Sequence, residues 1–265
     1  MSGREGQEPL DGLHARIEAQ LGALHLPGAL GCYRDLEAEL RAGEPGLRLL
    51  EGVLAAEMAS RDQHRYDRNL RAARLPVVKE IATFDFTALP SVSRGRIEEL
   101  ASGKFIAAHE AVILVGNPGT GKSHILSALC LEAVRHGFRA RFLTAAALVN
   151  ELLLARQELR VPKVLKQYGG FDLVAVDELG YVPFSREAAQ LLFEFFADRY
   201  ERRATALTTN LPFAQWAQVF GDETMTVALL DRLTHRSHVL MFNGDSYRAK
   251  ESRRRSEPRA AAAAS

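Results

Sequence analysis

The stretch Gly116-Asn-Pro-Gly-Thr-Gly-Lys-Ser123 decides the fold of this chain of 265 residues. It fits the glycine-rich pattern of a phosphate-binding loop, whose backbone N–H groups turn toward the phosphates of a nucleotide. An apolar run at 111–115 precedes the stretch, and a helical pattern at 123–136 follows it. A strand before the loop and a helix after it are the context that this pattern requires. We therefore expect a nucleotide site here; the alternative is a flexible Gly-Pro turn.

The loop assigns residues to the two cofactors that we expect, ATP and Mg²⁺. Lys122 is expected to contact the β- and γ-phosphates, and Ser123 is expected to bind Mg²⁺. The helix that follows the loop points its N-terminus at the anion. The residues expected to bind the nucleotide are Gly116, Asn117, Pro118, Gly119, Thr120, Gly121, Lys122, Ser123 and His124.

A second motif supplies carboxylates for the same site. The run Leu173-Val-Ala-Val-Asp-Glu178 is apolar until its last two residues. At the end of a buried strand, Asp177 can reach Mg²⁺ through Ser123 or a water molecule, while Glu178 faces the γ-phosphate as the catalytic base. A strand that ends in an acidic turn is common, so this catalytic interpretation depends on the phosphate loop.

Alternating strand and helix patterns predict the fold class. Strand patterns lie at 111–115, 140–143, 173–176, 205–208 and 238–242, and helical patterns lie at 123–136, 148–156, 186–200, near Trp216 and at 226–234. Such alternation predicts an α/β fold in which helices cover both faces of a parallel sheet.

The N-terminal part has a different pattern. Apolar residues at steps of three and four predict three amphipathic helices, at 10–24, 30–40 and 47–74. Pro27 and Gly28 are expected to end the first of these helices. We therefore expect a helical module for DNA binding or oligomerisation at 1–78, an ATPase domain at 79–250 and a basic, disordered tail at 251–265.

Composition excludes several classes of protein. No apolar run is long enough to cross a bilayer, and the N-terminus lacks the apolar core of a signal peptide, so we expect a cytoplasmic protein without membrane contact. Cys32 and Cys130 have no Cys or His neighbour at metal-ligand spacing and are expected to be reduced packing residues. His235 and His238 have no partnered carboxylates and are expected to pack or to cap. The net charge is +1, so any DNA-binding surface must be a local patch.

The adjacent Asp-Glu pair resembles the AAA+ group of ATPases. The base-reading Asn-Lys-x-Asp motif of GTPases and the Leu-Ser-Gly-Gly-Gln signature of transporter ATPases are both absent. In AAA+ proteins a polar residue at the end of the following strand senses the γ-phosphate, and Asn210 stands in that place. Asn is also an ordinary turn former, so Asn210 is either this sensor or a turn residue. Phe84 and Phe86 either stack near adenine, as the corresponding segment does in related ATPases, or belong to the core.

Several motifs, taken together, narrow the resemblance further. They are Leu70-Arg-Ala-Ala-Arg-Leu-Pro76, Phe84-Asp-Phe86, Ile97-Glu-Glu-Leu-Ala101, the phosphate loop, Asp177-Glu-Leu-Gly-Tyr181, Thr208-Thr-Asn210, Asp231-Arg-Leu-Thr-His235 and Phe242-Asn-Gly-Asp-Ser-Tyr-Arg248. This set closely resembles the IstB family, the ATP-binding helper proteins of insertion-sequence transposition, which are close relatives of the helicase loader DnaC. The small Ala175 and the basic tail depart from the family pattern.

The resemblance implies a function for the whole chain. It implies DNA-stimulated ATP hydrolysis, self-assembly into a homo-oligomer on double-stranded DNA, remodelling of that DNA and stimulation of an IstA-like transposase. A DnaC-like helicase loader is the alternative. Arg232 looks like the arginine finger that reaches ATP held by a neighbouring subunit. The other possibilities are that Arg236 is the finger, or that Arg232 pairs with an acidic residue on its own helix.

Two basic patches are candidates for DNA contact. The first, on one side of the third helix, contains Arg61, Arg65, Arg68 and Arg71, and the second contains Arg156, Arg160, Lys163 and Lys166. A stripe of guanidinium groups suits contacts with DNA phosphates. The second patch lies where DnaC-like proteins carry an extra helical element that faces nucleic acid. For both patches the alternative is a solvated surface.

Overall fold

The structure is a computed structural model that describes residues 10–39, 45–181, 183–244 and 246. It divides into two compact units, Met1–Arg68 and Asn69–Ser265. The predicted tail at 251–265 lies outside the described residues, and so do positions 245, 247 and 248 of the motif that ends at Arg248. No helix within the described ranges is both long enough and apolar enough to cross a membrane.

The first unit is helical, as its periodicity predicts. Its helices are α1 (Leu10–Ala23), α2 (Pro27–Glu39) and α3 (Pro45–Ala73), the last of which continues past the boundary at Arg68. The expected role of Pro27 is wrong, because α1 ends at Ala23 and Pro27 is the first residue of α2. A proline suits this position, since its φ is already helical and its missing N–H has no partner in the first turn.

A buried carboxylate joins two helices of the first unit. Glu57 of α3 is 5% exposed and accepts hydrogen bonds from the backbone N–H groups of Gly28 (3.0 Å) and Ala29 (3.3 Å). These groups lie in the first turn of α2, where N–H groups have no partner within the helix. Glu57 also accepts a hydrogen bond of 2.6 Å from Nε of Arg61. It therefore ties the start of α2 to α3.

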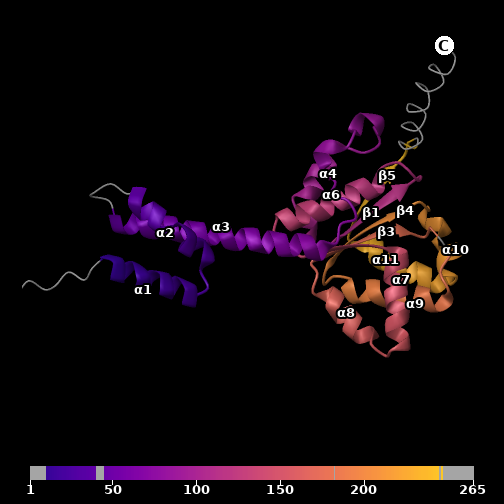
Figure 1. The fold of residues 1–265 in the computed structure, drawn as a ribbon. Helices are drawn as coiled ribbons and strands as arrows, with labels where there is room; N and C mark the ends of the chain where they lie inside the picture. The colour runs from indigo at the N-terminus through magenta and orange to yellow at the C-terminus, as the bar shows by residue number, and fades with distance from the viewer. Residues whose placement is uncertain (1–9, 40–44, 182, 245, 247–265) are drawn as a thin grey trace, which may run out of the picture. The chain divides into compact units, whose positions relative to one another are not determined.

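The second unit is built on a sheet of five parallel strands (Figure 1). The strands are β1 (Ala111–Gly116), β2 (Ala140–Thr144), β3 (Leu173–Leu179), β4 (Ala204–Thr209) and β5 (Ser237–Phe242), in the order β2-β3-β4-β1-β5. The prediction of an α/β fold with a parallel sheet is confirmed. β3 extends beyond the predicted strand and includes both Asp177 and Glu178.

Helices cover both faces of this sheet. They are α4 (Arg94–Ala101), α5 (Lys104–Ala107), α6 (Lys122–Arg135), α7 (Ala145–Gln157), α8 (Val161–Gly169), α9 (Arg186–Arg199), α10 (Trp216–Phe220) and α11 (Glu223–His235), with short 3-10 turns η1 (Ile81–Thr83), η2 (Phe86–Ala88) and η3 (Phe213–Gln215). Helix α6 packs on one face with α4 against it, while α7, α9 and α11 enclose a buried cluster on the other (Figure 1). The periodicity did not predict α4 or α5, because helices of eight and four residues contain too few turns to show a clear pattern. In α8 a pattern is present but was overlooked, since Val161, Val164, Leu165 and Tyr168 recur at steps of three and four.

The boundary between the two units lies earlier than the expected limit at residue 78. The end of α3 belongs to the second unit, because the Asn69 side chain donates to the carbonyl oxygens of Gly137 (3.2 Å) and Phe138 (3.3 Å). Arg141 of β2 donates to the carbonyl oxygen of Ala72 over 3.2 Å. These bonds hold the end of α3 against β2 and the residues just before it.

A buried guanidinium group binds several backbone carbonyl groups at the end of the sheet where β3 and β4 begin. Arg199, 1% exposed at the end of α9, donates to the carbonyl oxygens of Tyr168 (2.8 Å), Phe171 (3.2 Å) and Ala204 (2.6 Å). It also donates to the Thr205 hydroxyl over 3.3 Å. Burial lowers the pKa of Arg199 to about 9, so the group is still charged at neutral pH. It connects the end of α8 to the starts of β3 and β4.

Both cysteines are free thiols. Cys130 is buried in α6, as expected of a packing residue, and burial raises the pKa of its thiol to about 12. Cys32 is half-buried in α2, with its sulfur 3.7 Å from the carbonyl oxygen of Ala29.

Candidate active site

The phosphate loop follows the carboxyl end of β1 and leads directly into α6. Gly121 has φ +91°, a left-handed conformation that residues with a Cβ rarely adopt. A Cβ at this position would also come within 2.6 Å of the Phe84 ring. The backbone conformation and the close approach of this ring therefore both require glycine.

Lys122 lies inside the loop rather than in solvent. Its side chain is almost buried, and Nζ donates hydrogen bonds to the carbonyl oxygens of Gly116 (2.6 Å) and Asn117 (2.8 Å). The Thr120 hydroxyl donates to the same Asn117 oxygen over 2.8 Å. The ammonium group is therefore positioned in the centre of the loop, where the motif requires a cation for phosphate.

Ser123 and Asp177 meet, as the two motifs predict. The Ser123 hydroxyl donates a hydrogen bond of 2.9 Å to Oδ1 of Asp177, and the Thr208 hydroxyl donates one of 2.5 Å to the same oxygen. A hydroxyl and a carboxylate are hard oxygen ligands, which suit Mg²⁺. The residues present therefore fit a magnesium ion that is completed by nucleotide phosphates and water.

Glu178 follows Asp177 but has a different environment. Its side chain is exposed, whereas Asp177 is buried. Its φ is +62°, and its backbone N–H donates to the Thr208 hydroxyl over 2.9 Å. Both carboxylates line the same cavity, so a buried ligand group and an accessible base stand next to each other.

A cavity of about 500 Å³ contains these groups. It is lined by Pro76, Val77, Lys79, Thr83, Phe84, Asp85, Ala88, Leu89, Gly119, Thr120, Gly121, Lys122, Ser123, His124, Ser127, Phe142, Asp177 and Glu178. The volume is that of a typical small-molecule site. The segment at 76–89 forms one wall of the cavity. From the sequence, only the two phenylalanines of this segment were expected near the nucleotide.

The two phenylalanines differ in their access to the cavity. Phe84 lines it, whereas Phe86 does not and instead packs against Phe84 and lies under the Arg94 guanidinium. His124 of α6 holds the same wall, with Nε2 3.0 Å from the Glu80 carbonyl oxygen and 3.3 Å from the Thr83 hydroxyl. His124 thus connects the phosphate helix to the wall that Phe84 forms.

Asn210 comes directly after β4 and is half-buried, but it does not line the cavity. The turn that presents it is held by Thr209, whose hydroxyl accepts a hydrogen bond of 3.1 Å from the backbone N–H of Leu211. Sequence reasoning singled out Asn210 and missed Thr208, which contacts both carboxylate residues. A signal was present, since β4 carries three threonines among its six buried residues, and Thr208 is one of the two at its carboxyl end.

Arg232 lies at the opposite end of the sheet from the phosphate loop. It lines a small pocket with Ala111 and Thr205, which stand near the starts of β1 and β4. Its guanidinium lies 4.9 Å from the centre of the Phe193 ring and donates to the carbonyl oxygen of Ala228 over 3.0 Å. The six residues of β1 separate the two ends of the sheet by about 17 Å. Arg232 therefore does not serve the phosphate loop of its own chain.

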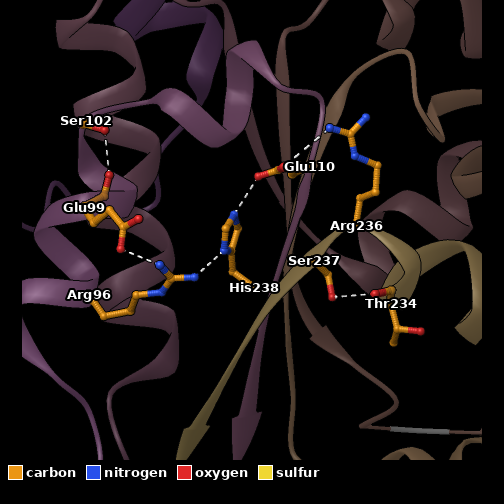
Figure 2. Close-up of polar contacts among 8 residues, drawn as sticks. All are labelled: Arg96, Glu99, Ser102, Glu110, Thr234, Arg236, Ser237 and His238. Carbon is orange, nitrogen blue, oxygen red and sulfur yellow. Dashed lines mark hydrogen bonds and ion pairs between the residues drawn. The ribbon is translucent and has the colours of Figure 1, made fainter.

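Arg236 and His238 share a carboxylate partner. Figure 2 shows Glu110 between them, with Arg236 Nη2 3.6 Å from Oε1 and His238 Nε2 2.8 Å from Oε2. The expectation that His238 has no partnered carboxylate is wrong, because Glu110 lies just before β1, which pairs with β5. Nδ1 of His238 lies 2.6 Å from the Arg96 guanidinium, which can only donate. This arrangement fits an imidazole with a proton on Nε2.

The two basic patches differ in their ion pairing. In the first, Arg61 pairs with Glu57 (2.6 Å) and Arg65 with Asp62 (2.9 Å) on their own helix; Arg68 and Arg71 are exposed. In the second, Arg160 pairs with Glu158. Arg156, Lys163 and Lys166 are exposed and form no ion pair within the part of the chain that the structure describes. Lys163 and Lys166 lie on α8, a helix at the predicted place of the extra element.

Comparison with known proteins gives the family. The chain matches the family described as IstB-like ATP binding protein over residues 19–255. A relative named as the ATP-binding protein of insertion sequence IS21, from Pseudomonas aeruginosa, is 41% identical over 202 residues, which are 76% of each chain. The corresponding protein of IS5376, from Geobacillus stearothermophilus, is 37% identical over 91% of this chain and 97% of its own.

Solved structures agree on the fold. The DnaC helicase loader has a TM-score of 0.53 at 21% identity, over 66% of this chain and 99% of its own. AMPPCP-bound DnaA from Aquifex aeolicus has a TM-score of 0.54 at 16% identity, over 65% of this chain and 52% of its own. Both share the AAA+ arrangement of the parallel sheet and helices. The chain therefore belongs to the IstB-like family of ATP-binding proteins of insertion sequences and has the AAA+ P-loop fold.

Proposed function

We propose that this protein is an ATP-hydrolysing regulator of insertion-sequence transposition that assembles on double-stranded DNA, remodels it and stimulates a partner transposase. The proposal is carried by the Ser123–Asp177 hydrogen bond, which joins the two motifs of an ATPase in a chain whose relatives are named for insertion sequences. We expect the protein to act in the cytoplasm, where ATP and DNA are both available.

The residues of the cavity have distinct proposed roles. A bound Mg²⁺ would supply positive charge next to the phosphates. Ser123 and Asp177 hold the metal, and Lys122 binds the β- and γ-phosphates. Glu178, accessible in the same cavity, orients the attacking water and accepts its proton. Asn210 is the proposed sensor of the γ-phosphate.

We also propose that the site is completed by a neighbouring subunit of a homo-oligomer. Phosphoryl transfer spreads negative charge over oxygens that Lys122 contacts from one side only, so a second cation accelerates the reaction. Arg232 supplies this cation in trans. Its place at the far end of the sheet from its own phosphate loop supports this assignment.

DNA contact is proposed for both basic patches. Exposed cations without a carboxylate partner gain most from DNA phosphates, because no existing ion pair has to be broken. By this criterion Lys163 and Lys166 on α8, with Arg156, are the stronger candidates. The stripe that contains Arg61, Arg65, Arg68 and Arg71 contributes further contacts.

Electron microscopy of the purified protein with duplex DNA tests the assembly. With ATP we expect a DNA-bound homo-oligomer, and with the Lys122→Ala variant we expect none. An assembly that forms equally well without nucleotide contradicts the proposal.

Strand transfer by the purified partner transposase should rise in the presence of the wild-type protein and ATP. Loading of a replicative helicase in place of this stimulation would identify a helicase loader.

A further inference from the structure

The two acidic residues of the site lie in a bulge of the sheet. The pairing of β3 with β4 shifts between two register positions, Val176 with Leu207 and Leu179 with Thr209. Asp177 and Glu178 therefore stand opposite a single residue, Thr208. Such bulges redirect side chains and are rare between parallel strands. Glu178 also has φ +62°, which residues other than glycine seldom adopt.

The Thr208 side chain takes the place of the missing backbone pairing. Its hydroxyl accepts a hydrogen bond of 2.9 Å from the Glu178 backbone N–H and donates one of 2.5 Å to Oδ1 of Asp177. A hydroxyl has one proton and two lone pairs, so both bonds can exist at the same time. Thr208 is 1% exposed, which keeps water from replacing either bond. One buried hydroxyl thus links the backbone of Glu178 to the carboxylate of Asp177.

These bonds restrict both carboxylate residues. Oδ1 of Asp177 receives two hydroxyl donors, from Thr208 and from Ser123 (2.9 Å). Within the described ranges no donor reaches Oδ2, which leaves that oxygen for the metal or its water. The bond to the Glu178 N–H holds the left-handed turn from which its exposed side chain enters the cavity.

We infer that Thr208 is a positioning residue for ATP hydrolysis, which orients the Asp177 carboxylate and fixes the turn that directs Glu178 into the cavity. The inference rests on the proposed ATPase function. Thr208 does not line the cavity itself, so it acts through two residues that do. The competing explanation is that Thr208 only fills space in the core, a role that valine, with the same shape, fulfils equally well.

Three variants separate these explanations. Thr208→Val keeps the shape and removes the hydroxyl, and Thr208→Ser restores the hydroxyl. Thr205→Val is the matched control, because Thr205 is a buried threonine of the same strand whose hydroxyl contacts Arg199 at the other end of the sheet. For each variant we measure kcat and KM for ATP, the thermal unfolding midpoint, and deuterium uptake by the 173–180 segment without nucleotide.

Thr208→Val should lower kcat by roughly 10- to 100-fold, as the loss of a supporting hydrogen bond does at other metal sites, and leave KM for ATP nearly unchanged. Its 173–180 segment should exchange faster, because the Glu178 amide loses its acceptor. Thr208→Ser should recover most of the kcat, and Thr205→Val should keep both properties. If Thr208→Val does not fold, Thr208→Ala replaces it.

Two results would overturn the inference. One is a wild-type kcat in Thr208→Val, and the other is unchanged exchange of the 173–180 segment. Exchange is measured without nucleotide, so it decides the structural step even if the wild-type protein hydrolyses no ATP. Absence of hydrolysis in the wild type would reject the proposed function instead, which keeps the two failures distinguishable.

Discussion

The Ser123 hydroxyl donates a hydrogen bond of 2.9 Å to the Asp177 carboxylate, although the two residues are 54 positions apart. They meet because β1 and β3 run parallel with only β4 between them, so their carboxyl ends lie at the same edge of the sheet. Ligand sites of open parallel sheets lie at this edge. The bond therefore brings the phosphate loop and the acidic strand into one site.

Removing the Ser123 hydroxyl should weaken the metal site. In Ser123→Ala we expect the affinity for nucleotide in the presence of Mg²⁺ to fall by at least roughly tenfold, because one oxygen ligand of the metal is lost. Titration of a fluorescent ATP analogue in Mg²⁺ and in EDTA measures this dependence. The control is Ser102→Ala. Ser102 is exposed, and neither it nor its hydrogen-bond partner lines the cavity. A Ser123→Ala protein with the wild-type response to Mg²⁺ would exclude Ser123 as a ligand.

Arg232 should act on ATP that a neighbouring subunit holds. Arg232→Ala keeps an intact phosphate loop, and Lys122→Ala keeps an intact finger. Each variant alone should be inactive, with Arg232→Ala lowering the rate by about 10³ or more. Mixed subunits should recover part of the DNA-stimulated ATPase activity.

The mixing experiment requires proof that the two variants co-assemble, for example by capture of one through a tag on the other. Full activity of Arg232→Ala alone, or no recovery in co-assembled subunits, would reject the role in trans. The search would then move to Arg236, which Glu110 holds in an exposed ion pair.

DNA affinity should depend on both basic patches. Reversal of Lys163 and Lys166 to Glu should weaken binding and reduce the slope of log affinity against log salt by about 2, since each lost phosphate contact contributes about 0.9. Reversal of Arg61, Arg65 and Arg68 should also weaken binding at moderate salt and leave ATP binding unchanged. Fluorescence anisotropy over a salt series measures both effects.

The matched control for the α8 patch is reversal of Lys104 and Arg202, two exposed cations outside both patches, which changes the net charge by the same amount. This control should retain the wild-type slope. A patch whose reversal leaves affinity and slope unchanged is only a solvated surface.

Arg199 should stabilise the second unit without taking part in catalysis. Arg199→Met leaves the carbonyl oxygens of Tyr168, Phe171 and Ala204 without this donor, and we expect the free energy of unfolding to fall by on the order of 2–4 kcal/mol. Arg202→Met, an exposed arginine near the same turn, should change it by less than about 0.5 kcal/mol. Thermal unfolding measures both. An unchanged unfolding midpoint in Arg199→Met would show that the buried bonds do not stabilise the fold.

Local patterns predicted the elements that carry strong periodicity or a fixed motif. Strand and helix patterns alternate around the loop at 116–123 and the run at 173–178, and this alternation predicted the parallel sheet. Helix α8 was expected only from the resemblance, although Val161, Val164, Leu165 and Tyr168 recur at the spacing of an amphipathic helix. The role of Pro27 was misassigned, since a proline is compatible both with the end of one helix and with the first position of another.

Contacts between distant segments could not be predicted where no motif joins them. The Glu110–His238 bond joins residues 128 positions apart, and no local pattern predicts such a pairing. The Thr208 bonds depend on a one-residue bulge between β3 and β4, which alternation along either strand does not reveal. The segment at 76–89 lacks periodicity, so its place as a wall of the cavity became visible only in the fold.

Hydrolysis and binding of ATP by four proteins test the central claim most directly. The wild-type protein should bind and hydrolyse ATP in the presence of DNA, and Lys122→Ala should bind it far more weakly, whereas the exposed-lysine control Lys104→Ala should match the wild type. Glu178→Gln should bind ATP as the wild type does but turn it over about 10² to 10⁴ times more slowly, because it lacks the base. Wild-type turnover by Glu178→Gln, or wild-type ATP affinity in Lys122→Ala, would contradict the assignment of this site.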